Sequence, residues 1–404
     1  MTAVVVTGLG VTAPNGLGVQ DYWEATLAGK SGIGRITRFD PSQYPARLAG
    51  EIPGFAAEEH LPSRLLPQTD RMTRLALVAA DWALADAGIQ PKELPESSMG
   101  VVTASSSGGF EFGQGELQAL WSRGSQYVSA YQSFAWFYAV NSGQISIRHG
   151  MKGPTSVLVS DQAGGLDAVA HARRQIRKGT AVVVSGAVDA SICPWGWVAQ
   201  LAAQRLTTRD EPSQAYLPFD GAADGYVPGE GGALLVMESE ESARARGARI
   251  YGEIAGYAAT FDPAPDSERP PGLRRAIELA LDDAGLGADE VDVVFCDAAA
   301  DPELDRIEAD AVTAVFGPGA VPVTAPKTMT GRLYSGAAPL DLATAFLAIR
   351  DGVIPPTVNV TPSPDYALDL VVDRPREAPG LRTALVLARG HGGFNSAAIV
   401  RAAA

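Results

Sequence analysis

The turn at Gln162 has the setting of a catalytic nucleophile without the nucleophile itself. A β-branched run from Val157 to Val159 predicts a buried strand, and a helix follows with Leu166 and Ile176 on its apolar face. Many α/β enzymes display a nucleophile at such a turn, because the first amides of the helix favour a developing anion. A carboxamide forms hydrogen bonds but cannot carry a covalent acyl group. These residues alone also fit an ordinary strand-turn-helix with a glutamine in its turn.

Cysteine and histidine are the other residues that could supply chemistry. An independent acyltransferase could use Cys193 as its nucleophile, but no histidine stands at a recognisable partner position. Cys193 is therefore interpreted as a small buried hydrophobic residue. Neither Cys193 nor Cys296 belongs to a disulfide framework, and the histidines lie apart from other ligand types, so no metal site is expected. The histidines are His60, His149, His171 and His391.

The composition excludes several classes of function. The chain has 404 residues, of which 46% are hydrophobic and 19% charged, as in globular proteins. A net charge of −14 argues against a nucleic acid or an anionic membrane as a partner. No apolar run reaches the roughly 18 residues that a membrane span needs. The chain has no basic region before its first apolar run, so we expect a cytoplasmic protein.

An alternating pattern of strands and helices occurs twice along the chain. The first copy predicts strands over 4–6, 99–104, 181–186 and 233–237, and helices over 21–28, 72–87 and 238–247. The second copy predicts a strand over 250–256, a helix over 273–284, a strand over 291–295 and another strand-turn-helix from residue 321. Two such copies imply two parallel-containing sheets covered by helices, with a boundary near residues 248–250.

A second candidate site lies between residues 105 and 121. Phe110, Gly113 and Leu117 recur there at helical spacing and would share one helix face. That face either packs on the core or lines a cavity whose size these side chains set. An aromatic run over residues 127–138 follows, which predicts either core packing or a subunit interface.

Four segments together resemble the ketosynthases of the thiolase superfamily over nearly the whole chain. They are residues 4–10, 219–232, 327–331 and 390–396. The resemblance implies an α/β, thiolase-like fold with a duplicated βαβαβαββ pattern, layered α-β-α-β-α. Residues 1–250 would form the N-terminal half and residues 251–404 the C-terminal half.

The resemblance also implies which catalytic residues are replaced. The elbow cysteine of ketosynthases falls at Gln162, the first histidine at Asp297 and the second at Arg332, while the lysine is retained as Lys327. The condensing Cys-His-His site is therefore absent, and whether the chain itself is an enzyme stays open. Condensation needs a thiolate and neutral imidazoles that stabilise an enolate. We expect Asp297 to form an ion pair with Arg332 or Lys327, since either charge buried alone is costly.

This substitution pattern is similar to the chain length factors, the β-subunits of bacterial aromatic (type II) polyketide synthases. The resemblance implies a heterodimer with an active ketosynthase α-subunit and a substrate tunnel at their interface. Malonyl and polyketide chains would arrive on the phosphopantetheine of an acyl carrier protein, with no other cofactor. Phe110, Gly113 and Leu117 match the gate positions of that family, and the small residues imply a tunnel for a medium or long chain.

Two questions remain open at the level of sequence. The first question is whether Gln162 helps to decarboxylate the malonyl carrier protein for priming or has a structural role. The second is whether the chain is instead a stand-alone malonyl-carrier-protein decarboxylase or acyltransferase, which is the alternative to a subunit of a heterodimer. The net charge of −14 predicts that the acidic carrier protein docks mainly on the partner ketosynthase.

Overall fold

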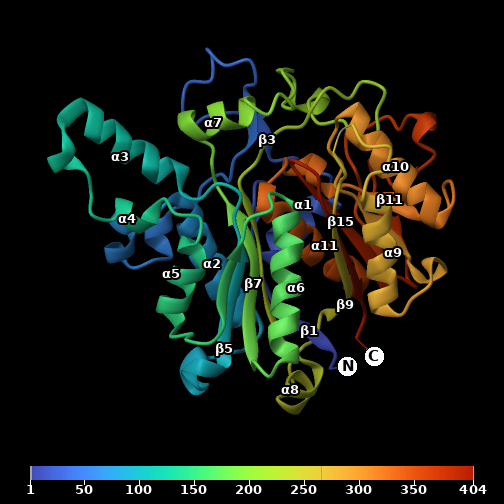
Figure 1. Cartoon of the computed structure of the whole chain (residues 1–404), viewed down its shortest axis with the longest axis horizontal. Coiled ribbons are helices and arrows are strands. Elements are labelled where there is room, and N and C mark those ends of the chain that lie inside the picture. The colour runs from blue at the N-terminus through green and yellow to red at the C-terminus, as the bar shows by residue number, and fades with distance from the viewer. Residues whose placement is uncertain (1, 265, 404) are drawn as a thin grey trace.

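The N-terminal half is a sheet between two layers of helices (Figure 1). The computed structural model describes residues 2–264 and 266–403. The strands lie in the order β1-β8-β7-β5-β6, with β5 parallel to both of its neighbours. Their bounds are Val4–Ala13 for β1, Gly231–Ser239 for β8, Val182–Asp189 for β7, Met99–Ala104 for β5 and Thr155–Leu158 for β6. Helices α2 (Arg71–Asp86) and α5 (Val140–His149) cover the outer face, and α6 (Ala163–Arg177) covers the inner face.

The C-terminal half repeats this arrangement. Its strands lie in the order β9-β16-β15-β10-β11-β13, with bounds Gly252–Phe261, Phe394–Arg401, Thr383–Gly390, Val293–Phe295, Pro322–Thr324 and Asp369–Leu370. Helix α9 (Leu273–Ala284) packs on the outer face beside α10 (Pro302–Phe316). Helix α11 (Ala337–Asp351) contacts strands of both halves. The predicted α/β, thiolase-like order of layers, α-β-α-β-α, is confirmed.

The two sheets join into one. Strand β1 pairs with β9 at Val5 and Val6, so the described residues form a twelve-stranded sheet that includes β2 (Gly16–Leu17) at the end of β1. Strand β16 lies between β9 and β15 and is antiparallel to both. Each half of the sheet is therefore held to the other by backbone hydrogen bonds as well as by packed helices.

Helices α6 and α11 form the central layer and are buried on nearly every side. Residues 337–348 of α11 are all buried, and most of them are alanine, leucine or another small or apolar residue. A helix that is apolar all round is the kind that a core accepts between two sheets. The turns that precede these two helices therefore lie at the centre of the molecule, where both halves meet.

Two shorter helices each follow a strand of the N-terminal half. Helix α1 (Val19–Leu27) follows β2, and helix α8 (Glu240–Ala245) follows β8. Strands β3 (Ile33–Arg35) and β4 (Leu48–Gly50) pair with each other as a separate two-stranded sheet. No helix within the described ranges is long and apolar enough to cross a bilayer.

An arm of helices stands away from the body of the N-terminal half (Figure 1). It consists of α3 (Phe110–Arg123) and α4 (Gln132–Ala135), and α7 (Pro194–Leu201) lies against the base of α3. The aromatic run beside it is exposed, with between 38% and 53% of the surface of Tyr127, Tyr131, Trp136, Phe137 and Tyr138 accessible. Of the two predictions for that run, core packing is wrong for these five side chains in the isolated chain.

Strand β6 corrects another prediction. The run from Val157 to Val159 was expected to be buried, but β6 is the outermost strand and Val159 is 49% exposed. A β-branched run indicates a strand without indicating its place in the sheet. The strand before the elbow therefore offers an unpaired edge to solvent.

Candidate functional site

The backbone of the elbow is held in a strained conformation by both halves of the chain. Asp161 has a φ of 51°, in the left-handed region that non-glycine residues seldom adopt. Its carbonyl accepts a hydrogen bond from Ser335 Oγ at 2.8 Å, and its carboxylate accepts one from the His391 amide at 2.9 Å. These contacts fix the turn through groups that do not depend on the residue at position 162.

Gln162 lies at the N-terminus of α6 and its side chain is buried. The residue is 2% exposed, and among the described residues its Oε1 atom has no hydrogen-bond partner. It lines a pocket of about 520 Å³, which we call the former catalytic pocket, together with Arg332 and the turn at residues 390–393. A buried acceptor without a partner is costly, so this carbonyl is available to a donor that enters the pocket.

Asp297 and Arg332 form a buried ion pair, which confirms one of the two predicted pairings. Arg332 Nη2 lies 2.8 Å from Asp297 Oδ2 and 3.0 Å from Oδ1. The same nitrogen donates to the carbonyl of Arg389, and the Arg389 amide donates to Asp297 Oδ1 at 2.8 Å. Burial lowers the pKa of Arg332, but Asp297 and the neighbouring tyrosines raise it more, so the net direction is upward. The guanidinium is committed to internal partners.

Lys327 pairs with a residue that the sequence did not single out. Its Nζ atom lies 2.8 Å from Asp341 Oδ2 of α11 and also donates to the Cys296 carbonyl. Burial raises the pKa of Asp341, and the charge of Lys327 opposes that shift. The predicted alternative, an ion pair between Asp297 and Lys327, does not form.

These residues limit the chemistry of the former catalytic pocket. Gln162 contributes an amide, and Asp297 neutralises the charge of Arg332. Residues 162, 297 and 332 therefore supply neither a thiolate nor an imidazole. Such a site can form hydrogen bonds to a bound group but cannot form an acyl intermediate through position 162. Within residues 2–264 and 266–403, no group of three or more His, Cys, Asp or Glu side chains is placed to hold a metal ion.

Two of the three predicted gate residues pack against Trp195, and the third lines a pocket together with it. Phe110 stacks on Trp195 with ring centroids 4.5 Å apart and an interplanar angle of 19°. A Cβ atom on Gly113 would lie 2.9 Å from Cζ3 of the Trp195 ring, so glycine leaves room for the indole. Leu117 and Trp195 line a second pocket of about 630 Å³. The structure therefore brings Phe110, Gly113 and Leu117 to one place on α3.

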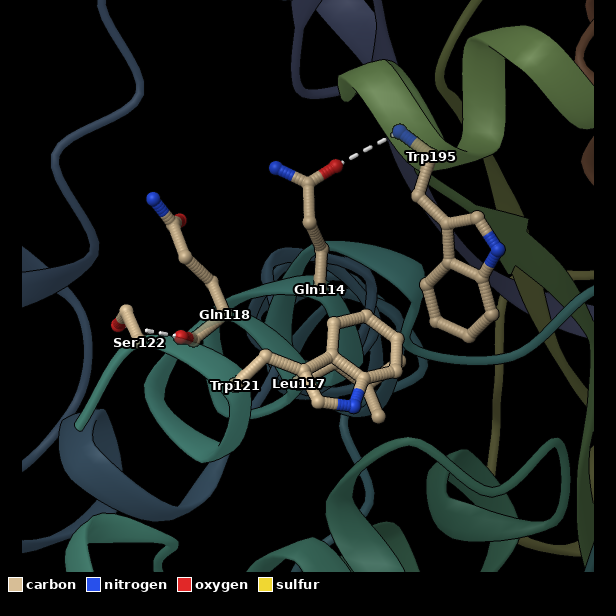
Figure 2. A pocket seen from close by; sticks show the side chains of 6 residues that line it. All are labelled: Gln114, Leu117, Gln118, Trp121, Ser122 and Trp195. Atoms are coloured by element: carbon tan, nitrogen blue, oxygen red, sulfur yellow. Dashed lines mark hydrogen bonds between the residues drawn. The ribbon is translucent and has the colours of Figure 1, made fainter. Parts of the chain in front are cut away.

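The gate pocket also contains residues that sequence reasoning missed (Figure 2). Gln114 Oε1 accepts a hydrogen bond from the Trp195 amide at 2.7 Å, which ties α3 to the start of α7. Trp121 lies further along α3 and is 78% exposed. The signal for Trp195 was present in the sequence, since Pro194 at the first turn marks a helix start beside an aromatic residue. The lining consists of Gln114, Leu117, Gln118, Trp121, Ser122 and Trp195.

Cys193 has the features of a structural residue. It is 4% exposed, and its Sγ atom accepts a hydrogen bond from the Gly196 amide at the start of α7. Burial raises the pKa of the Cys193 thiol to about 11. Since the thiolate is the nucleophilic form, this geometry gives no support to an acyltransferase that uses Cys193.

Comparison with known proteins places these features in a family. Residues 1–243 match the family described as beta-ketoacyl synthase, N-terminal domain, and residues 251–361 match beta-ketoacyl synthase, C-terminal domain. The tetracenomycin polyketide synthase ketoacyl synthase beta subunit of Streptomyces glaucescens is 62% identical over 401 residues, 98% of each chain.

Two solved structures share the whole fold. The ishigamide ketosynthase/chain length factor aligns with a TM-score of 0.90 and 30% identity, and it covers 100% of each chain. AntDE:AntF, a type II polyketide synthase acyl carrier protein in complex with its ketosynthase bound to the hexaketide, aligns with a TM-score of 0.89 and 28% identity, again over 100% of each chain.

Proposed function

We propose that this chain, which belongs to the beta-ketoacyl synthase family, is the non-condensing subunit of a ketosynthase–chain length factor heterodimer in aromatic polyketide biosynthesis. Within the family it falls with the beta subunits, or chain length factors, of type II polyketide synthases. The elbow carries this proposal. Its strained backbone is kept, but Gln162 and the Asp297–Arg332 pair stand where acyl transfer needs a thiolate and imidazoles.

In this function the chain forms part of the wall of a tunnel for the growing polyketide. The pocket at Leu117 and Trp195 is lined mostly by apolar surface and includes the exposed Trp121, where a partner could complete it. Malonyl units and the growing chain arrive on the phosphopantetheine of an acyl carrier protein, and no resident cofactor takes part. Gly113 adds no side chain to the gate and leaves its space open, which favours a medium or long product.

Co-expression with and without the partner ketosynthase tests the proposal directly. The purified pair is supplied with malonyl carrier protein, and CO2 release and polyketide formation are measured. We expect polyketide from the pair and neither product from this chain alone. Polyketide made by the isolated chain would contradict the proposal.

The variant Gly113→Phe tests the tunnel in the same assay. It should shorten the polyketide because the new ring displaces Trp195 into the gate pocket. An unchanged product length would contradict the assignment of this pocket to the tunnel.

A role for Gln162 in priming is a second candidate function. The observation that favours it is the position of the buried Gln162 amide in the lining of a pocket of about 520 Å³. The amide could hold a malonyl thioester while CO2 leaves, because its N–H groups can stabilise a developing oxyanion. If Gln162→Ala lowers CO2 release by the pair without lowering its condensation of a supplied acetyl primer, Gln162 acts in priming. Equal loss of both activities would assign it a structural role.

We also propose that the acyl carrier protein docks mainly on the partner. A surface with a net charge of −14 repels an acidic carrier protein, whereas a basic docking site on the ketosynthase would attract it. The carrier protein in AntDE:AntF is described in complex with its ketosynthase, which is consistent with this arrangement.

A further inference from the structure

One buried carboxylate, that of Asp70, caps two helices at the same time. As the N-cap of α2, Asp70 accepts a hydrogen bond from the Met72 amide to Oδ1 at 2.8 Å. Its Oδ2 atom accepts a second one from the Phe112 amide at 2.7 Å. Phe112 lies in the first turn of α3, whose own N-cap residue, Gly109, provides no side-chain hydrogen bond. A core helix therefore supplies the cap that α3 lacks.

The backbone before α3 is shaped for this contact. A Cβ atom on Gly109 would lie 2.8 Å from the Cβ atom of Asp70 and 3.1 Å from its carboxyl carbon. Only a residue without a side chain lets α3 start this close to Asp70. The carboxylate itself is shielded, since Asp70 is 2% exposed. A hydrogen bond in such surroundings does not compete with water.

Helix α3 depends on polar contacts for its position. Of its fourteen residues, Gly113 and Ala119 are buried, whereas α2 buries ten of its sixteen residues. Little apolar burial therefore fixes α3 to the body. The Arg38–Glu111 ion pair also holds its first turn, but Glu111 has 45% of its side chain exposed, and exposed pairs contribute little. The contact with Asp70 is the shielded one.

We propose that Asp70 is a positioning residue for the gate, and through it a determinant of polyketide length, although it does not line the gate pocket. The inference rests on the proposed function, because it assumes that α3 forms part of the tunnel wall. The first turn of α3 carries Phe110, which stacks on Trp195, and Gly113 follows one turn later. When the cap is lost, this turn frays and the stacked rings move, so the tunnel no longer has one defined length.

The variant Asp70→Ser should remove the hydrogen bond to α3 and keep the N-cap of α2. Serine is itself a good N-cap and can still serve the Met72 amide of α2. Its side chain is shorter and does not reach the Phe112 amide of α3. The fold and α2 should therefore remain intact while α3 loses its link. Asp70→Asn, which keeps the shape of the side chain and one oxygen acceptor, should have an intermediate effect.

Two measurements on the heterodimer test the proposal. Hydrogen exchange should be about tenfold faster at residues 110–114 of α3 in Asp70→Ser and unchanged in α2, the factor expected when one shielded hydrogen bond is lost. Mass spectrometry should show at least about a tenfold increase in products shorter or longer than the main one. Ser239→Ala is the matched control, because it removes the N-cap of α8, far from the gate, and should leave the products unchanged.

The outcomes distinguish this inference from the proposed function. If Gly113→Phe alters product length but Asp70→Ser alters neither exchange nor products, the role of Asp70 is refuted and the tunnel stands. If exchange in α3 rises in Asp70→Ser while both variants keep the normal product, Asp70 positions α3 but the tunnel assignment fails, and the claim about polyketide length fails with it.

Discussion

At the scale of single residues, the Asp297–Arg332 pair should make a large contribution to stability that depends on both partners. Arg332→Met leaves Asp297 buried without its cation, which typically costs about 3–5 kcal/mol. The two groups are 2% and 5% exposed, so water cannot replace the lost partner. Urea unfolding monitored by fluorescence measures the loss. The matched control is Arg350→Met, which breaks a half-exposed pair with Asp351 and should cost less than about 1 kcal/mol; equal losses would contradict the prediction.

A second residue-scale prediction concerns Asp305 on α10. Burial, with a smaller contribution from Glu308, raises the pKa of Asp305 to about 8, although the Phe219 amide bonded to its Oδ2 atom lowers it. The unfolded chain releases this proton near pH 4, whereas the folded protein keeps it until about pH 8. The free energy of unfolding should therefore fall as pH rises through this window, by up to about 1.4 kcal/mol per pH unit for one group.

Asp305→Asn tests that sign, because asparagine keeps an oxygen acceptor and cannot titrate. The variant should lose part of the pH dependence of the unfolding midpoint between pH 4 and pH 8. Asp70 and Asp189, with pKa values raised by burial to about 7 and about 6, act in the same direction and remain in the variant. An unchanged slope in Asp305→Asn would show that Asp305 is ionised in the folded protein.

The sequence predicted the contact between Asp297 and Arg332 but not the partner of Lys327. Asp297 and Arg332 were placed by motif, and opposite charge predicted their contact. Lys327 instead pairs with Asp341, which lies on α11 and is brought to the lysine when this helix folds back into the central layer. Trp195 shows the same limit, because helices α3 and α7 meet only in the folded chain. Such pairings depend on tertiary contacts that no local spacing encodes.

At the scale of elements, the open edge of β6 should be covered by the partner. The strand is paired on one side only, and Val159 beyond its end is 49% exposed. Val159→Lys places a charge where strand edges or apolar surfaces would meet and should weaken the heterodimer at least about tenfold, measured by light scattering with the partner ketosynthase. Phe261→Lys, at an exposed site on β9, is the control and should leave assembly unchanged; equal effects would place the interface elsewhere.

Elements with strong periodic patterns were predicted closely. The helix expected over 273–284 is α9, and the strand expected over 99–104 is β5, each with the same bounds. The helix expected over 72–87 differs from α2 by one residue at each end. Residues 390–396 were matched by motif without an assigned element, and they form the turn between the long strands β15 and β16. The motif does not reveal that β16 also pairs with β9, since that strand lies far earlier in the sequence.

At the scale of the whole molecule, net charge should govern the encounter with the carrier protein. Binding to the isolated chain should be weak at low salt and should not weaken further as salt is added, because salt screens the repulsion between two acidic proteins. Binding to the heterodimer should be tighter and should fall with salt. Calorimetry or anisotropy at two ionic strengths measures both. Tight, salt-sensitive binding by the isolated chain would contradict docking on the partner.

The position of β16 has a consequence for how the chain is made. This strand lies between β9 and β15 in the sheet, although it follows both in the sequence. The ribosome therefore releases both neighbours before the strand that connects them. Until β16 emerges, the sheet exists as two separate pieces. The β9–β16 pairing that joins them links residues 253–261 to residues 394–401, which are separated by most of the C-terminal half. Assembly of the full sheet is thus a late event of synthesis, during which the unpaired flanks of β9 and β15 are open to chaperones or to wrong strands.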